Sequence, residues 1–131
     1  MRSTEFIIEN EQPEYSFKIT GSWKDRVWVT MFETASGGLT EVGEAILDIN
    51  PKDNTVYFNR IDITSGQGKG KGAKLVSEVL QVVTARGFNS VTSYVNHNNV
   101  ASQGLFRKLG FNVIESDEWD AQYGDYWKKE L

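Results

Sequence analysis

A short segment in which glycine alternates with lysine, residues 67–72 (QGKGKG), separates two apolar stretches of the chain. The stretch before it, Val56 to Ile63, has the composition of a strand, and the stretch after it, Leu75 to Val83, repeats its apolar residues with helical spacing. Glycines leave backbone N–H groups uncovered and permit left-handed φ angles, so successive amides can converge on an anion at the positive end of a helix. This order of strand, glycine loop and helix predicts a phosphate-binding loop.

The spacing of the glycines distinguishes among the known kinds of phosphate-binding loop. The P-loop pattern G-x-x-x-x-G-K-[ST] is not matched anywhere in the segment. The Rossmann variant G-x-G-x-x-A fits Gly68, Gly70 and Ala73, but no acidic residue that could bind a ribose occurs between Glu78 and Glu115. The pattern that remains is Q-x-x-G-x-G, and the alternative is a basic, solvated loop without a ligand.

A second motif lies at residues 95–111 (VNHNNVASQGLFRKLGF). It reads as a strand ending in Val, an Asn four residues later, a helix with a Leu-aromatic pair, and a closing Gly-Phe. An ordinary capped helix has these features too, because Asn favours helix starts and Gly favours helix ends. Together, however, the two motifs resemble the signatures of the GNAT acetyltransferase superfamily, in the expected order over residues 56–111. The matching positions of the second motif are Asn99, Ser102, Leu105, Phe106, Gly110 and Phe111.

The order of predicted elements agrees with this resemblance. Strands come first and helices late, and a helix between two strands implies a parallel pair with a right-handed crossover. We therefore expect one GNAT-like domain over residues 1–131, of α/β (α+β) class, with two main helices. Its sheet is expected to be mixed and mostly antiparallel, with about six to seven strands and a splayed parallel pair. The expected strands are 15–23, 27–32, 41–49, 56–63, 90–96, 111–114 and 123–128, and the expected helices follow the glycine loop and cover about 99–109.

The resemblance implies acetyl-CoA as the cofactor. Its pantetheine arm would lie in a V-shaped gap between the fourth and fifth strands, against the backbone of Ile61 and Ile63 and the side chain of Asn99. Its pyrophosphate would meet the amides of Gly68 to Ala73. The expected cofactor-binding residues are Ile61, Ile63, Gln67, Gly68, Lys69, Gly70, Lys71, Gly72, Ala73, Asn99, Ser102 and Phe106.

The implied reaction is direct attack of a primary amine on the thioester in a ternary complex. Family members usually place one or two helices between the first two strands, to help build the acceptor side of the site. Here only Lys24-Asp25-Arg26 is available there. We therefore expect an open acceptor side, which favours an amine on a protein or peptide, such as a lysine or an N-terminus.

Three residues are candidates for the general base. Asp62 should alternate to the face opposite Ile61 and Ile63, so it could face the site or only solvent. His97, the only histidine, follows the strand that ends at the gap, and a pKa of about 6.5 suits proton transfer. A loop histidine bonded to backbone is its simpler interpretation. Glu44 is a weaker candidate, because exposed carboxylates are common on strands.

The sequence departs from the family at Phe106. Many members have a tyrosine there, whose hydroxyl can protonate the CoA thiolate, and phenylalanine cannot. Water or Tyr94 could supply the proton instead, and loss of one general acid typically costs about 10²- to 10⁴-fold in rate. The alternative function is a non-catalytic acyl-CoA-binding or protein-interaction module with the same fold.

The charge balance limits the partners that we expect. A formal net charge of −4 argues against a nucleic-acid binder that uses Lys69, Lys71 and Lys74, because such proteins usually present a basic face. The same balance permits a cationic acceptor. The acidic and aromatic segment 115–131 could recognise one, or it could be a solvated loop followed by a core strand.

The remaining features of composition favour a cytoplasmic protein. Without cysteine, the chain has no disulfide, no thiolate nucleophile and no cysteine metal cluster, and no metal site is expected. The apolar run Phe6-Ile7-Ile8 is too short for a signal peptide or a membrane span. An exposed last strand or the aromatic C-terminal segment could pair two copies in a homodimer.

Overall fold

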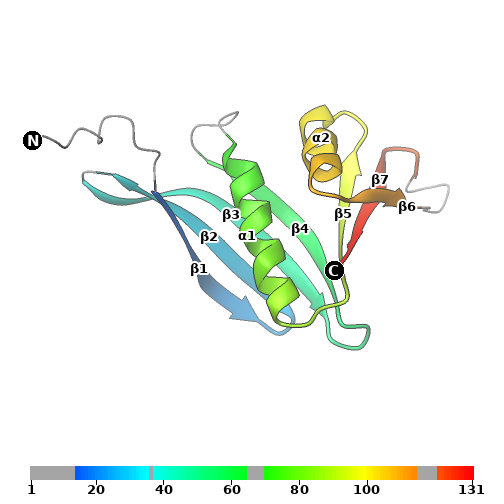
Figure 1. Ribbon diagram of the computed structural model, residues 1–131, viewed down its shortest axis with the longest axis horizontal. Coiled ribbons are helices and arrows are strands. Elements are labelled where there is room, and N and C mark those ends of the chain that lie inside the picture. The colour runs from blue at the N-terminus through cyan, green and yellow to red at the C-terminus, as the bar shows by residue number, and fades with distance from the viewer. Residues whose placement is uncertain (1–13, 36, 65–69, 115–120) are drawn as a thin grey trace, which may run out of the picture.

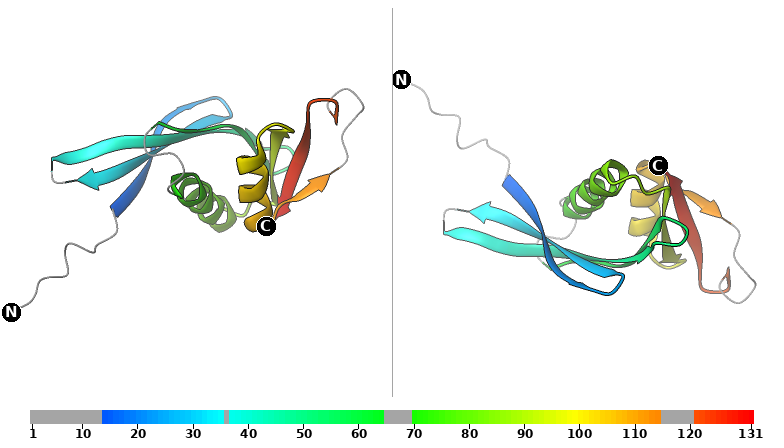
Figure 2. Two further views of the ribbon diagram at one scale, coloured as in Figure 1. Left: turned by 90° about the horizontal axis from the view of Figure 1, so that it is seen from above. Right: turned by 90° about the horizontal axis from the view of Figure 1, so that it is seen from below.

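The computed structural model describes residues 14–35, 37–64, 70–114 and 121–131. Within these ranges, the chain forms one seven-stranded sheet in the order β1-β2-β3-β4-β5-β7-β6, with helices α1 and α2 on the same face (Figures 1 and 2). The only parallel pair in it is β4–β5. The predicted fold class is confirmed. The strands are β1 Glu14–Trp23, β2 Arg26–Ala35, β3 Gly38–Asn50, β4 Thr55–Ile63, β5 Ser90–Asn96, β6 Asn112–Ile114 and β7 Gly124–Glu130, and the helices are α1 Lys71–Ala85 and α2 Val100–Lys108.

The first four strands form an antiparallel meander with short connections. A two-residue turn, Lys24-Asp25, joins β1 to β2, and Lys24 takes the positive φ of 54° that such tight hairpin turns require. Consequently no helix lies between these strands. No helix among the described residues covers the sheet face opposite α1 and α2 (Figure 2).

Helix α1 packs its apolar stripe onto this meander. The apolar residues that recur every three to four positions along α1 are buried against Met31, Ala45, Leu47 and Val56 of the sheet. Burial of each aliphatic side chain contributes roughly 1.5–3 kcal/mol, so this interface is a main source of stability. The predicted buried face is confirmed, and it consists of Leu75, Val76, Val79, Leu80 and Val83.

Helix α2 begins and ends as the sequence predicts. The Asn99 side chain accepts a hydrogen bond from the Ser102 amide at 3.0 Å, which caps the first turn. Gly110, with a φ of 93°, ends the helix and leads into β6. Phe106 and Phe111 anchor the helix, with ring centroids 4.8 Å apart. Neither described helix has the length and apolarity that a bilayer crossing requires.

Candidate cofactor site in the gap between two strands

Strands β4 and β5 separate after a short paired stretch. They pair only from Thr55–Ser90 to Phe58–Ser93, although β4 continues to Ile63. The β3–β4 register shifts where they part, because Leu47 opposes Phe58 while its predecessor opposes Arg60. The shift leaves one extra residue in β4, a β-bulge that bends the strand.

Asn59 is that extra residue, and it is held in place. Its Nδ2 donates to Asp48 Oδ2 at 2.9 Å. Arg26 in turn donates to Asp48 through Nε at 2.7 Å and Nη2 at 3.1 Å. These hydrogen bonds lower the pKa of the Asp48 carboxyl below its ordinary value. Partial burial acts in the opposite direction and raises the pKa, but its effect is smaller. The bulge is therefore a supported feature that opens the gap.

Two adjoining cavities fill the space beyond the paired stretch. One has a volume of about 400 Å³, and the other has about 310 Å³. Ile61, Asn99, Ser102 and Phe106 line both. The larger cavity brings together seven of the twelve predicted cofactor-binding residues: Ile61, Ile63, Lys71, Gly72, Asn99, Ser102 and Phe106.

The N-terminus of α1 opens onto the larger cavity. Gly70 caps the helix in a left-handed conformation, with a φ of 78° and no side-chain hydrogen bond to the cap. The first helical hydrogen bond runs from the Lys74 amide to the Gly70 carbonyl at 3.1 Å, so the amides before it point out of the helix end. A Cβ atom at Gly72 would lie 3.8 Å from Leu105 and 3.9 Å from Ile63. A side chain at position 72 would therefore project toward Leu105 and Ile63, two residues that line the larger cavity. The predicted residues Gln67, Gly68 and Lys69 lie outside the described part of the chain.

The lysines near this helix end are not simple solvated cations. Lys71 is buried, and its Nζ lies 3.1 Å from Glu33 Oε1, an ion-pair distance without hydrogen-bond geometry at that oxygen. Lys74 lies over the ring of Tyr15, with Nζ 5.6 Å from the centroid. Ala73 lines the hollow between α1 and β1 instead of the gap. The structure thus brings Lys71 to the gap but not the side chains of Lys74 and Ala73.

Two candidate bases, Glu44 and Asp62, lie directly opposite each other on β3 and β4. Because alternate strand residues face opposite ways, both acids face away from the helices, whereas Ile61 and Ile63 face them. Asp62 Oδ2 lies 2.5 Å from Arg60 Nε, and both side chains in this ion pair are substantially exposed. The acids therefore border the open face of the sheet beside the gap.

The third candidate base, His97, lies apart from them. Its amide donates to the Tyr123 carbonyl at 2.8 Å, and its Nε2 lies 3.4 Å from Asp125 Oδ2. It lines neither of the two cavities. The structure does not bring His97 together with Asp62.

At position 106, many family members have a tyrosine that acts as the general acid, whereas here a phenylalanine packs in the core. Phe106 is 2% exposed and packs against Phe58, with ring centroids 6.3 Å apart, and against Phe111. Its ring still lines both cavities. The gap therefore has a hydrocarbon edge at the place where the family pattern expects a hydroxyl group.

A tyrosine cluster borders the gap on the open face. The sequence indicated Tyr94 as a possible proton donor and Tyr126 only as part of the aromatic segment 115–131, and it did not indicate Tyr57. The rings of Tyr94 and Tyr126 make an edge contact at 5.0 Å. Burial raises the pKa of the Tyr57 hydroxyl above its ordinary value, as do the nearby Tyr126 and Asp48, while a hydrogen bond with the Tyr94 backbone opposes this. The alternation of buried and half-buried residues along β5 could have indicated which face Tyr94 takes, but not the partners that the register brings to it.

The chain is similar in sequence and in fold to known proteins. Residues 62–120 match the model of the FR47-like protein family. A mycothiol acetyltransferase from Saccharomonospora viridis is 36% identical over 67 residues, which are 51% of this chain and 22% of that protein. The chain thus spans about a fifth of the length of this relative.

Two solved structures show the same fold. A Bacillus subtilis acetyltransferase in complex with CoA superposes with a TM-score of 0.73 at 13% identity, over 90% of this chain and 99% of that one. The PaiA N-acetyltransferase of Thermoplasma acidophilum, in complex with coenzyme A, superposes with a TM-score of 0.66 at 21% identity. The match covers 82% of this chain and 62% of that one. The fold that the resemblance implies is therefore confirmed by these acetyltransferase structures, and residues 62–120 carry the match to the FR47-like family.

Proposed function

We propose that this chain, acting as one GNAT-like domain, transfers an acetyl group from acetyl-CoA to a primary amine. The observation that carries the proposal is the gap between β4 and β5. It lies between the start of α1, which has no side-chain cap, and the Asn99-capped start of α2. The names of the similar proteins agree with this class of reaction.

The residues around the gap fit a long, amide-bearing cofactor with a phosphate group. Pairing between β4 and β5 ends at Phe58, and pantetheine amides can bind backbone groups of residues 59–62, the next part of β4. The start of α1 offers backbone donors and a positive dipole end for the pyrophosphate. Asn99 and Ser102 line both cavities and supply polar contacts for the arm.

The chain's own groups would then perform three tasks. Acetyl-CoA supplies an activated thioester. Asp62 or Glu44, beside the gap, removes a proton from the incoming ammonium, and His97 remains a third candidate for this base. Backbone N–H groups near Ile61 to Ile63 stabilise negative charge on the carbonyl oxygen. Phe106 cannot return a proton to the thiolate, so Tyr94 or water would do so.

The open face of the sheet favours a macromolecular acceptor. The tight Lys24-Asp25 turn stands where family members place helices, so a large amine-bearing surface can approach Glu44 and Asp62 without a steric barrier from that connection. Their negative charge complements a lysine or N-terminal ammonium. We therefore prefer a protein or peptide amine as the acceptor.

Phe106 supports a second candidate function. A protein that kept the cofactor site but lost the acid could serve as an acyl-CoA-binding or protein-interaction module without fast turnover. The two functions differ in whether the thioester is consumed in the presence of an amine.

Release of free CoA thiol, measured with lysine-containing peptides and with small amines, tests the proposal. We expect amine-dependent thiol release and a mass increase of one acetyl group on the acceptor. The matched control is the Gly70→Asp, Gly72→Asp double variant, which places carboxylates where phosphates should bind and should lose this activity. Tight acetyl-CoA binding without amine-dependent release would favour the binding module, and activity confined to small amines would contradict the preferred acceptor.

A further inference from the structure

The start of α1 carries a buried ion pair that the proposed reaction does not use. Lys71 is the first residue of the helix, and its side chain is 9% exposed. Its Nζ lies 3.1 Å from Glu33 Oε1, and the Glu33 side chain is 26% exposed. Glu33 lies on β2, two residues after the core residue Met31, so strand alternation directs both side chains toward the helices. The pair therefore joins the start of α1 to the sheet beneath it.

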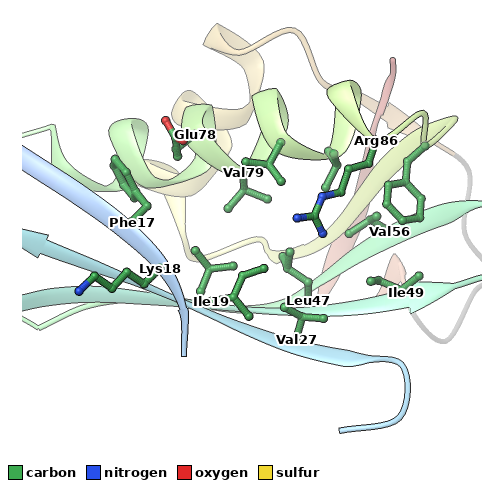
Figure 3. Close-up of a pocket in the computed structure, with 14 residues that line it drawn as sticks. Phe17, Lys18, Ile19, Val27, Leu47, Ile49, Val56, Glu78, Val79 and Arg86 are labelled. Atoms are coloured by element: carbon green, nitrogen blue, oxygen red, sulfur yellow. The ribbon is translucent and has the colours of Figure 1, made fainter. Parts of the chain in front are cut away.

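Packing gives little reason for charges at this place. Farther along α1, Val79 of the helix and Leu47 of the sheet line an apolar groove in which aliphatic side chains meet (Figure 3). A buried ion pair generally stabilises a fold no better than well-packed apolar residues of similar volume. Lys71 also adds a positive charge at the positive end of the helix dipole, which is unfavourable. Another reason for the pair should therefore be sought in its surroundings.

These surroundings are the proposed cofactor site. Lys71 lines the larger cavity of the gap together with Gly72, whereas Glu33 is not among its lining residues. The Glu33 carboxylate nevertheless lies within one lysine side chain of the helix start that should bind the pyrophosphate. A carboxylate so close to a phosphate site would weaken phosphate binding by charge repulsion unless a cation neutralises it.

We propose that Lys71 is a positioning residue whose ammonium holds and neutralises Glu33, and that it is not a ligand of the pyrophosphate. The backbone donors at the start of α1 then bind the phosphates. Lys71 ties that helix start to β2 and removes the repulsion that Glu33 would otherwise exert. This inference rests on the proposed cofactor site, because it assigns Lys71 and Glu33 their roles within it.

Calorimetric titration of acetyl-CoA into a single and a double variant distinguishes the two roles of Lys71. Lys71→Met leaves the Glu33 charge without this cation, so we expect the Kd to rise about tenfold. The Lys71→Met, Glu33→Gln double variant has lost both charges, and its Kd should return to within threefold of the parent value. A lysine that binds the pyrophosphate directly would leave the double variant as weak as Lys71→Met, and this result would overturn the proposal.

Salt dependence separates charge repulsion from structural damage. The deficit of Lys71→Met relative to the parent chain should shrink at high salt, because salt screens the repulsion between Glu33 and the phosphates. A deficit of the same size at low and high salt would contradict the proposal. If Lys71→Met does not fold, the double variant still decides between the two roles, because it leaves neither charge of the pair unpartnered.

The Lys128–Glu130 pair on β7 supplies the matched controls. Lys128 Nζ lies 3.1 Å from Glu130 Oε2, and neither residue lines the two cavities of the gap. Lys128→Met, alone and with Glu130→Gln, makes the same charge changes away from the start of α1, so the Kd should stay within threefold of the parent value. A tenfold rise in Lys128→Met as well would show that overall charge sets the affinity and would overturn the proposal. Absence of acetyl-CoA binding by the parent chain would instead contradict the proposed cofactor site itself, and this role with it.

Discussion

Glu44 on β3 and Asp62 on β4 oppose each other across the sheet, on the face that the described helices leave open. Like charges directly opposite each other on neighbouring strands are destabilising. Arg60 offsets part of this repulsion through its ion pair with Asp62. We propose that one of these two acids serves as the base, and a variant of each can separate this role from an effect on stability.

The first prediction separates the two acids. If Asp62 is the base, Asp62→Asn should lower kcat by about 10²- to 10⁴-fold, because the amine would then be deprotonated only by solvent. Glu44→Gln should change kcat much less and alter mainly the KM for a cationic acceptor. Steady-state kinetics of both variants, with peptide and small amines, would measure this.

Stability provides the control for this prediction. Removal of either charge relieves repulsion, so neither variant should have a lower Tm than the parent chain. A loss of activity that accompanies a loss of fold would therefore count against a catalytic role. Full activity in both acid variants would leave His97 as the remaining candidate.

Phe106→Tyr should increase turnover. The ring at position 106 lines both cavities of the gap, so a hydroxyl there can protonate the leaving thiolate, and a general acid typically contributes about 10²- to 10⁴-fold. We expect a rise in kcat of about tenfold or more, with the Kd for acetyl-CoA unchanged within threefold. Phe106→Leu, which supplies no proton, should show no rise. An unchanged kcat in Phe106→Tyr would show that proton return does not limit the reaction.

Gly124→Ala and Gly104→Ala should change stability in opposite directions. A Cβ atom at Gly124 would overlap the Val95 carbonyl oxygen and lie 2.9 Å from Asn96 Cα, so β7 would be pushed from β5 at a cost of about 1–3 kcal/mol. Gly104 lies within α2 with no atom near the added methyl group, and alanine there should stabilise by about 0.5–1 kcal/mol. Urea unfolding of the two variants measures both effects. Equal free energies of unfolding would show that β5 and β7 do not approach this closely.

The Asp48 carboxylate should stabilise the fold at neutral pH, and this stabilisation should be lost in acid. Its pKa is lower in the folded chain because Arg26 donates two hydrogen bonds to it. Such a group stabilises the fold at pH values above its unfolded pKa of about 3.9, and this contribution disappears as the pH falls through the lower folded value. Asp48→Asn should therefore be less stable than the parent chain at pH 7, and the difference should shrink toward pH 3.

Denaturant unfolding at pH 7, 5 and 3 would measure this difference. Arg26→Gln should show the same pH dependence, because it removes the other half of the interaction. A deficit of Asp48→Asn that stays constant down to pH 3 would contradict the assigned cause of the pKa shift.

Local pattern was enough to predict most elements and part of the site. The alternation in 90–96 and the helical spacing after the glycine loop correspond to β5 and α1 as observed. The asparagine at position 99 caps α2 as its residue type predicts. Each of these features depends on residues close together in the chain.

Features that depend on register between distant segments could not be predicted. The bulge at Asn59 depends on how β3 aligns with β4, and the Lys71–Glu33 pair joins α1 to β2. The extent of burial along α2 could not be predicted from the sequence either. Phe106 is buried, whereas Ser102 and Leu105 are half-buried because they line the larger cavity.

Calorimetric titration of acetyl-CoA into the purified protein tests the central claim most directly. We expect micromolar binding by the parent chain and loss of binding in the Gly70→Asp, Gly72→Asp double variant. Gly104→Asp, which adds a carboxylate on α2 at a glycine with open space around it, should bind as the parent chain does. Absence of binding by the parent chain, or equal binding by the double variant, would contradict a cofactor site at the start of α1.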